Sequence, residues 1–244
     1  LQSKGIIGFT DGIKTIQNSR LMSRIMRSAF DLGSLVMQHA EDFELAEHGT
    51  VNDGIISTKL GLQGITDLAE KIIIERDLSL LEDFNCRYHI SQISSSKSVD
   101  VINKKKDHLE FTTGVSINNL SLNENDIGDF RTFLKLSPPL RTEDDRISLV
   151  KAINKNLIDV IVSDHKPEDE ESKRLTFTQA ATGASGIETL LPLSLELFHN
   201  GSVKLTKIIE LLTCNPARVL KIDKGSLTIG NEADFCIVDI NKPW

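Results

Sequence analysis

Three side chains able to bind a metal ion each follow a short apolar run in a different part of the chain. They are Asp11, His39 and Asp164, and each stands one or two residues beyond the end of its run. Imidazole and carboxylate groups are ligands that zinc and related ions accept in proteins. Taken singly, an aspartate after a strand is more often a helix N-cap or a turn residue, and a lone histidine is more often structural. A shared metal site and separate structural roles are therefore both open for these residues.

The elements that must position these side chains alternate along the chain between apolar runs and longer amphipathic segments. We predict buried strands at residues 5–9, 35–38, 86–93, 111–115 and 159–162. Helical spacing of apolar residues predicts helices at residues 20–32, 65–81, 98–106, 146–154, 188–198 and 206–212. Such alternation is typical of an α/β fold with a parallel sheet, whose reactive groups lie at the carboxyl ends of the strands. Gly-bounded segments between residues 225 and 240 predict a small β-element outside this region.

Composition excludes several classes of partner. The 244 residues carry a net charge of −7, and the basic cluster Lys104–Lys106 is too small for a phosphate-binding surface, so we expect no nucleic-acid partner. No apolar run reaches the length of a membrane span, and the first residues do not form a signal peptide. The cysteines Cys86, Cys214 and Cys236 are too scattered for a disulfide framework. We therefore expect a cytoplasmic protein that does not bind membranes.

A series of motifs along nearly the whole chain resembles the dihydroorotases, which are cyclic amidohydrolases. In order, they are FTDG at residues 9–12, QHAED at 38–42, STKLGLQG at 57–64, YHIS at 88–91, LSPPLRTEDDR at 136–146, SDHKP at 163–167, GASGIET at 183–189, TCNPA at 213–217, and KGSL through ADF at 224–235. The chain resembles the C-terminal portion of this family. The resemblance implies a partial (β/α)8 TIM-type amidohydrolase barrel, from about its fourth strand, in residues 1–218. Residues 219–244 are then part of a small β-sandwich domain.

The resemblance also implies a reaction and a set of metal ligands. Dihydroorotase interconverts carbamoyl-aspartate and dihydroorotate in pyrimidine biosynthesis, with two zinc ions that share a hydroxide. By position in the motifs, Asp11 would bridge the metals and His39 would ligate one of them. Asp164 would be both a metal ligand and the catalytic general acid and base.

Several positions depart from the family pattern or belong to its substrate loop. Gln92 stands where the family has a metal-binding histidine, and an amide is a much poorer zinc ligand than an imidazole. Ser137 replaces an asparagine that contacts the substrate, and Glu168 replaces a substrate-facing histidine. Gly183 belongs to a loop whose backbone touches the substrate in the family. The resemblance therefore implies substrate-binding positions at Ser137, Glu168 and Gly183, and an impaired metal site at Gln92.

Three functions remain open at this point. The first is a dihydroorotase that works with the altered metal site. The second is a non-catalytic homologue that serves as a structural partner of aspartate transcarbamoylase. The third is a hydrolase of another cyclic amide, similar to allantoinase or hydantoinase, which the serine before Pro138 supports. Family members are commonly homo-oligomers, and we expect the same here.

Overall fold

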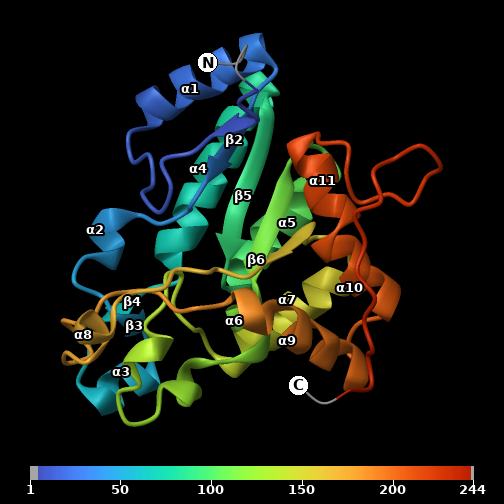
Figure 1. The fold of residues 1–244 in the computed structure, drawn as a ribbon. Coiled ribbons are helices and arrows are strands. Elements are labelled where there is room, and N and C mark those ends of the chain that lie inside the picture. Colours follow the sequence, from blue (N-terminus) through green and yellow to red (C-terminus); the bar gives the residue numbers. More distant parts are fainter. Residues whose placement is uncertain (1–4, 243–244) are drawn as a thin grey trace.

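The sheet at the centre of the fold contains five strands that all run parallel (Figure 1). The structure is a computed structural model that describes residues 5–242. The strands, in their order across the sheet, are β1 (Gly8–Phe9), β2 (Leu35–Gln38), β5 (Arg87–Ile93), β6 (Thr112–Ser116) and β7 (Val160–Val162). Spatial order thus follows chain order, as it does in a barrel built from βα units. The predicted α/β fold, a partial (β/α)8 barrel, is confirmed.

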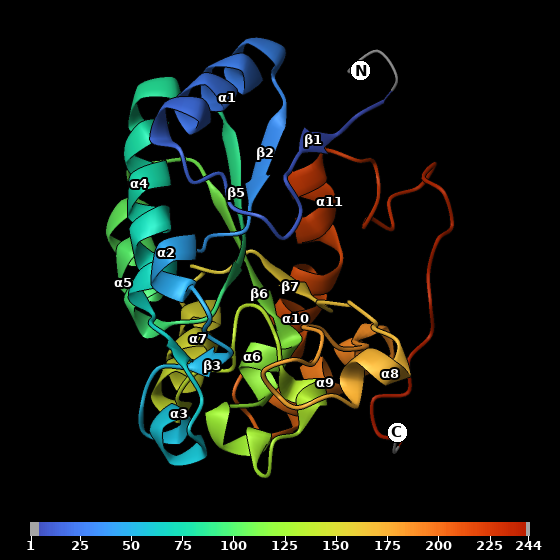
Figure 2. The ribbon, with the colours of Figure 1, turned by 90° about the vertical axis from the view of Figure 1, so that its left-hand side faces the viewer.

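Helices from successive crossovers lie side by side on one face of the sheet (Figure 2). They are α1 (Ser19–Leu32), α4 (Leu68–Phe84), α5 (Ser96–Lys105) and α7 (Glu143–Asn154), and α10 (Leu205–Leu212) continues the layer beside β7. In α1, the buried side chains are Met22, Met26 and Ala29, which share one face at helical spacing. They belong to a large apolar cluster that also contains strand residues such as Ile90 and Val115. This cluster fixes the sheet against its helices.

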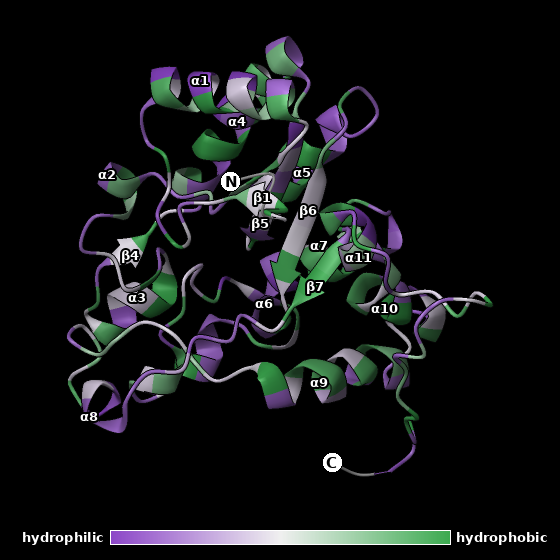
Figure 3. Ribbon diagram, turned by 45° about the horizontal axis from the view of Figure 1, so that its top comes forward, coloured by the Kyte–Doolittle hydropathy of each residue, from purple (hydrophilic) through white to green (hydrophobic). Residues whose placement is uncertain are grey.

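The other face of the sheet is covered by α11 (Cys214–Leu220), which lies on the side opposite to α1 and α4 in Figure 2. Its Val219 packs with Leu35 of β2 and Val160 of β7 in a separate small cluster. The remaining elements are α2 (Phe43–Ala46), β3 (Val51–Asn52), α3 (Ile55–Leu60), β4 (Gly64–Ile65), α6 (Ile117–Ser121), α8 (Glu170–Lys173), α9 (Ile187–His199) and 3-10 turns at Glu124–Ile127 and Thr132–Leu134. Figure 3 contrasts the hydrophobic strand β7 with the hydrophilic helix α8 at the rim.

All five predicted strands are present, and the differences at the helices have local causes. Helix α4 begins at Leu68 rather than at residue 65, because Gly64–Ile65 pair with Val51–Asn52 as the parallel strands β4 and β3. Helix α5 begins earlier than predicted, because the side chain of Ser95 caps it by accepting from the backbone N–H of Ser98. Local hydrogen bonds therefore decide these boundaries.

The short strands predicted between residues 225 and 240 are not formed. Within the described residues 221–242 there is no strand, and Leu227 and Ile237 expose 88% and 94% of their surface. A strand needs a neighbour to pair its backbone, and this segment has none in the described chain. The expected domain boundary after residue 218 falls inside α11, which packs on the barrel sheet. The assignment of 219–244 to a β-sandwich domain stays a prediction, and residues 243–244 lie outside the described residues.

Candidate functional site

A cavity of about 850 Å³ lies at the carboxyl ends of the parallel strands. Among its lining side chains are the predicted site residues His39, Gln92, Ser137, Asp164, Glu168 and Gly183. Residues from separate parts of the chain meet here because parallel strands end at the same edge of a sheet. Asp11 lines a neighbouring cavity of about 420 Å³ between β1, β2 and α1. The structure thus brings together all the predicted site residues except Asp11.

His39 follows β2 directly and is buried at the cavity wall. Its Nε2 lies 3.2 Å from Oγ of Ser137, so the imidazole and the hydroxyl share a hydrogen bond. Burial lowers the pKa of His39, and the negative charge of Glu70 acts in the opposite direction. An uncharged imidazole in this position can donate or accept a hydrogen bond to a ligand.

Asp164 follows β7 by two residues and lines the same cavity. Its Oδ1 accepts a hydrogen bond of 2.9 Å from Nε2 of Gln92, and its Oδ2 lies 3.5 Å from Oγ of Ser116. Burial raises the pKa of Asp164, while the hydrogen bonds from Gln92 and Ser116 lower it. The backbone φ of Asp164 is 50°, in the left-handed region that side chains seldom occupy. Such backbone strain persists only where the surrounding structure enforces it, and it is frequent at active sites.

The segment after β7 packs closely against residues 183–187 through their backbone. Nδ1 of His165 accepts from the backbone N–H groups of Gly186 and Ile187, at 3.1 and 3.3 Å. A Cβ atom at Gly186 would approach the carbonyl oxygen of Ser163 to 2.1 Å, so only glycine fits there. At Gly183, where φ is 136°, a Cβ would lie 2.5 Å from the carbonyl oxygen of Lys166. The predicted substrate loop is therefore packed directly against the segment that carries Asp164.

Glu168 does not stand as an isolated negative charge at the cavity. Its Oε1 lies 3.3 Å from Nζ of Lys166, and both residues line the cavity. Repulsion of an anionic ligand, which its sequence position suggested, is thus offset by the neighbouring ammonium group.

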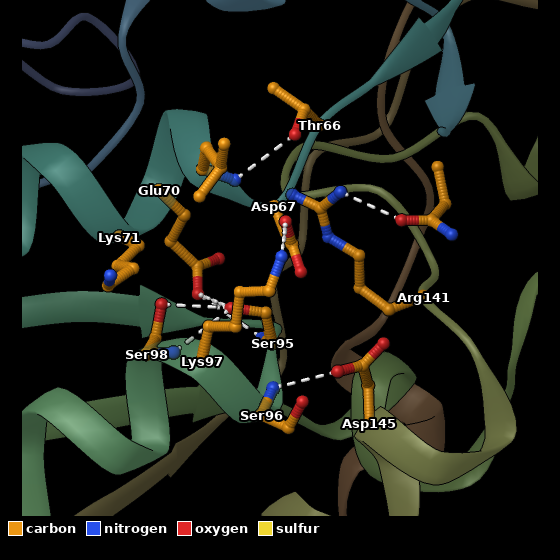
Figure 4. A network of polar contacts seen from close by, with 12 residues as sticks. Thr66, Asp67, Glu70, Lys71, Ser95, Ser96, Lys97, Ser98, Arg141 and Asp145 are labelled. Atoms are coloured by element: carbon orange, nitrogen blue, oxygen red, sulfur yellow. Dashed lines mark hydrogen bonds and ion pairs between the residues drawn. The ribbon is translucent and has the colours of Figure 1, made fainter. Parts of the chain in front are cut away.

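A buried polar network behind the cavity was not found from the sequence (Figure 4). The carboxylate of Glu70, only 2% exposed, accepts from the backbone N–H and the hydroxyl of both Ser94 and Ser95. Arg141, also buried, donates from Nε to Oγ of Ser94 and from Nη1 to Oδ1 of Asn52. The network therefore fixes the segment that follows Gln92. Its sequence signal was a glutamate within the buried stripe of α4, next to Ala69.

Glu41 is a second residue that the sequence reasoning passed over. It lines the cavity together with Asp164, and burial raises the pKa of its carboxyl group. Arg141 lowers this pKa and Glu70 raises it, so the buried network acts on the cavity through charge. Its place in the QHAED motif was the available signal.

The donor atoms of the described residues do not fit the two zinc ions that the family resemblance implies. Within residues 5–242, no three His, Cys, Asp or Glu side chains come close enough together to hold a metal ion. The carboxylate of Asp164 is hydrogen-bonded to an amide, His39 pairs with Ser137, and Asp11 turns to the neighbouring cavity. Within the described residues, the groups that can act on a ligand are therefore the side chains that line the cavity. In the same part of the chain, no helix is both long and apolar enough to cross a membrane.

Comparison with known proteins shows similarity to amidohydrolases, among them proteins named dihydroorotase, along the full chain. The model of the amidohydrolase family matches residues 4–243. A protein named dihydroorotase from Ehrlichia canis is 40% identical, and one from Ehrlichia chaffeensis is 38% identical; each match covers 100% of this chain and 55% of the relative. A dihydroorotase from Desulforapulum autotrophicum is 36% identical over 99% of this chain and 57% of its own length. The chain thus spans about half the length of the curated relatives it matches.

Solved structures share the fold at lower identity. The L-hydantoinase (dihydropyrimidinase) of Arthrobacter aurescens superposes with a TM-score of 0.82 at 23% identity, covering 95% of this chain and 55% of that chain. The dihydroorotase of Saccharomyces cerevisiae, in complex with 5-fluoroorotic acid, gives 0.71 at 16% identity, with 91% and 62% covered. These likenesses establish the barrel architecture. With the family model matched along almost every residue, this chain belongs to the amidohydrolase family.

Proposed function

We propose that this chain takes part in dihydroorotase-type hydrolysis of a cyclic amide, the interconversion of dihydroorotate and carbamoyl-aspartate. The observation that carries the proposal is the position of Asp164, a half-buried carboxyl group facing the same cavity as the His39–Ser137 pair. Relatives with the name dihydroorotase, 35–40% identical along the chain, support this reaction over other cyclic amides. Localisation in the cytoplasm and assembly as a homo-oligomer belong to the same proposal.

Asp164 carries the proton in this proposal. During ring opening, its carboxylate takes a proton from the water that attacks the ring carbonyl carbon. It then delivers that proton to the ring nitrogen as the carbon–nitrogen bond breaks. Ring closure runs through the same steps in reverse. The raised pKa of Asp164 is suited to a group that must both accept and donate a proton.

The other cavity residues hold and orient the ring. The hydroxyl of Ser137 and the imidazole of His39 are in contact with each other, so a ligand polar group can be shared between them. Gln92 holds Asp164 in place through its amide. Gln92 also stands where the family has a histidine, which is a stronger metal ligand, and we propose that metal binding is impaired in this chain.

The experiment that tests the proposal is the cyclisation of carbamoyl-aspartate by the purified protein, compared with the variant Asp164→Asn. Asparagine has nearly the same shape but cannot shuttle the proton, so we expect activity to fall by roughly 10²- to 10⁴-fold. Hydantoin and allantoin are assayed in parallel as alternative substrates. Full activity of Asp164→Asn would contradict the role of this carboxyl group, and turnover of hydantoin alone would replace the proposed substrate.

A second candidate is a non-catalytic structural role as a partner of aspartate transcarbamoylase. The pairing of Gln92 with Asp164, at a position where the resemblance implies a metal-binding histidine, favours this candidate over a fully active enzyme. Its test is size-exclusion chromatography of the two purified proteins, separately and mixed. Joint elution without turnover would select this candidate, and separate elution would remove its support.

A further inference from the structure

Three lysine side chains converge on the loop at residues 178–183, beside the cavity. Each ammonium group donates hydrogen bonds to backbone carbonyl oxygens of this loop. The pairs are Lys135 with Thr178 and Ala180 (2.8 and 2.8 Å), Lys173 with Ala181 and Gly183 (2.8 and 2.7 Å), and Lys166 with Thr182 (2.6 Å). The sequence reasoning assigned no role to any of these lysines.

Lys135 and Lys173 are committed to the loop. They are 8% and 4% exposed, and each donates to two carbonyl oxygens. Burial lowers the pKa of both ammonium groups; for Lys173 the charge of Glu168 acts in the opposite direction, and those of Lys135 and Lys166 lower the pKa further. These two lysines therefore hold the loop in place and add positive charge behind it.

Lys166 differs from the other two because it still has capacity to bind a ligand. Its side chain is 37% exposed, lines the cavity and donates to a single carbonyl oxygen, that of Thr182. An ammonium group has three N–H donors, so at least one remains after the bonds to Thr182 and Glu168. Carbonyl oxygens carry no net charge, so the negative groups that act on Lys166 are Glu168, in its ion pair, and Asp164, whose pKa the ammonium group lowers.

We propose that Lys166 receives the carboxylate of the ligand, so that the site selects a carboxylate-bearing ring over a neutral ring of the same shape. Glu168 is then the internal competitor for this ammonium group and weakens ligand binding. Lys135 and Lys173 are positioning residues that keep the loop carbonyls, and with them Lys166, in place. This inference rests on the proposed function, because it names the group that recognises the anionic part of that substrate.

The test uses binding of orotate and of uracil, measured by calorimetry on the intact protein. Uracil has the same ring without the carboxylate, and neither probe requires turnover. The variants are Lys166→Met, Lys166→Arg and Glu168→Gln, with Lys97→Met as the matched control. Lys97 forms a comparable ion pair of 2.9 Å with Asp67, but it lies on α5 and does not line the cavity (Figure 4).

We expect Lys166→Met to weaken orotate binding roughly 10- to 100-fold, as loss of a charge-assisted hydrogen bond does, and to leave uracil binding unchanged. Lys166→Arg should restore most of the orotate affinity, and Lys97→Met should match the wild-type protein. Glu168→Gln should tighten orotate binding several-fold, because it removes the competing charge without touching the bond to Thr182. A purely structural role of Lys166 predicts equal losses for orotate and uracil.

Several outcomes overturn the inference. They are wild-type orotate affinity in Lys166→Met, weaker orotate binding in Glu168→Gln, loss of orotate binding in Lys14→Met instead, and no orotate binding by the wild-type protein. Lys14 provides this comparison because it lines the same cavity. Lys166-dependent orotate binding without cyclisation of carbamoyl-aspartate would support the inference and contradict the proposed catalytic function. Failure of the inference, seen in orotate binding, is therefore distinguishable from failure of the proposed function, seen in the cyclisation of carbamoyl-aspartate.

Discussion

Gln92 donates its side-chain amide to Oδ1 of Asp164 over 2.9 Å, which ties the end of β5 to the segment after β7. β6 lies between these two strands in the sheet, and its last residue, Ser116, approaches the other carboxylate oxygen. The three strands thus share a single hydrogen-bonded cluster at their carboxyl ends. A carboxylate satisfied in this way has less need of a metal ion as its partner.

Replacing Gln92 with histidine should raise the affinity for zinc. Histidine at position 92 would remove the amide that is hydrogen-bonded to Asp164. Its imidazole would supply a stronger zinc ligand next to a carboxylate that is then free to bind zinc as well. We expect a gain of roughly 10- to 100-fold, comparable to the losses that follow when metal-site partners are removed. Competition with a zinc-binding dye measures the affinity, and elemental analysis after dialysis measures occupancy.

Gln92→Ala is the matched control for that gain, because it frees the Asp164 carboxylate without adding a donor. Equal zinc affinity in Gln92→His and Gln92→Ala would show that the residue at position 92 does not limit metal binding.

The meeting of His39, Gln92 and Asp164 could be predicted because apolar runs mark the strands, and parallel strands end at one edge. The position of Asp11 could not. It precedes Gly12, whose φ of 70° turns the chain after β1, and strand periodicity carries no information about the direction of such a turn. The structure places Asp11 in the neighbouring cavity.

The burial of charged residues on α4 is a second limit of the sequence. Periodicity assigns the charges of this helix to its outer face, yet Glu70 and Asp77 both lie in the buried stripe. The partners of Glu70 are Ser94 and Ser95, just after β5. Asp77 accepts from the hydroxyl of Tyr88 on β5, at 2.6 Å, and from the guanidinium group of its neighbour Arg76. Helical periodicity does not show these partners, which compensate the buried carboxylates in the folded protein.

Glu70→Gln should destabilise the protein by about 2–4 kcal/mol. The buried carboxylate accepts from the backbone N–H and hydroxyl groups of Ser94 and Ser95. In glutamine an NH2 group replaces one of the two accepting oxygens, so a hydrogen-bond donor would face the N–H and O–H donors of the serines. Urea unfolding of both proteins at neutral pH measures the difference. Glu75→Gln is the control on the same helix, because its partly exposed pair with Lys71 contributes less than about 0.5 kcal/mol. Equal stability of the two variants would remove the structural role assigned to Glu70.

The stability of the protein should fall between about pH 6.5 and pH 4 through His89. This histidine is 5% exposed, and its Nδ1 lies 2.8 Å from Oγ1 of Thr112. Burial lowers the pKa of His89 from 6.5 to about 4; the charge of Asp159 opposes this shift, and that of Lys106 adds to it. Because the folded-state pKa lies below the unfolded one, the unfolded chain gains a proton in this window that the folded protein does not accept. The free energy of unfolding then decreases as the pH falls, by up to about 3 kcal/mol.

His89→Gln tests this assignment because glutamine cannot titrate but can still accept a hydrogen bond from Thr112. Urea unfolding of both proteins at several pH values from 4 to 7.5 gives the two stability profiles. Carboxylates titrate in both proteins, so their contributions cancel in the difference between the profiles. We expect the wild-type profile to fall more steeply below pH 6.5, by the equivalent of one proton, whatever the overall stability of the variant. Parallel profiles would show that His89 is protonated in the folded protein as readily as in the unfolded chain.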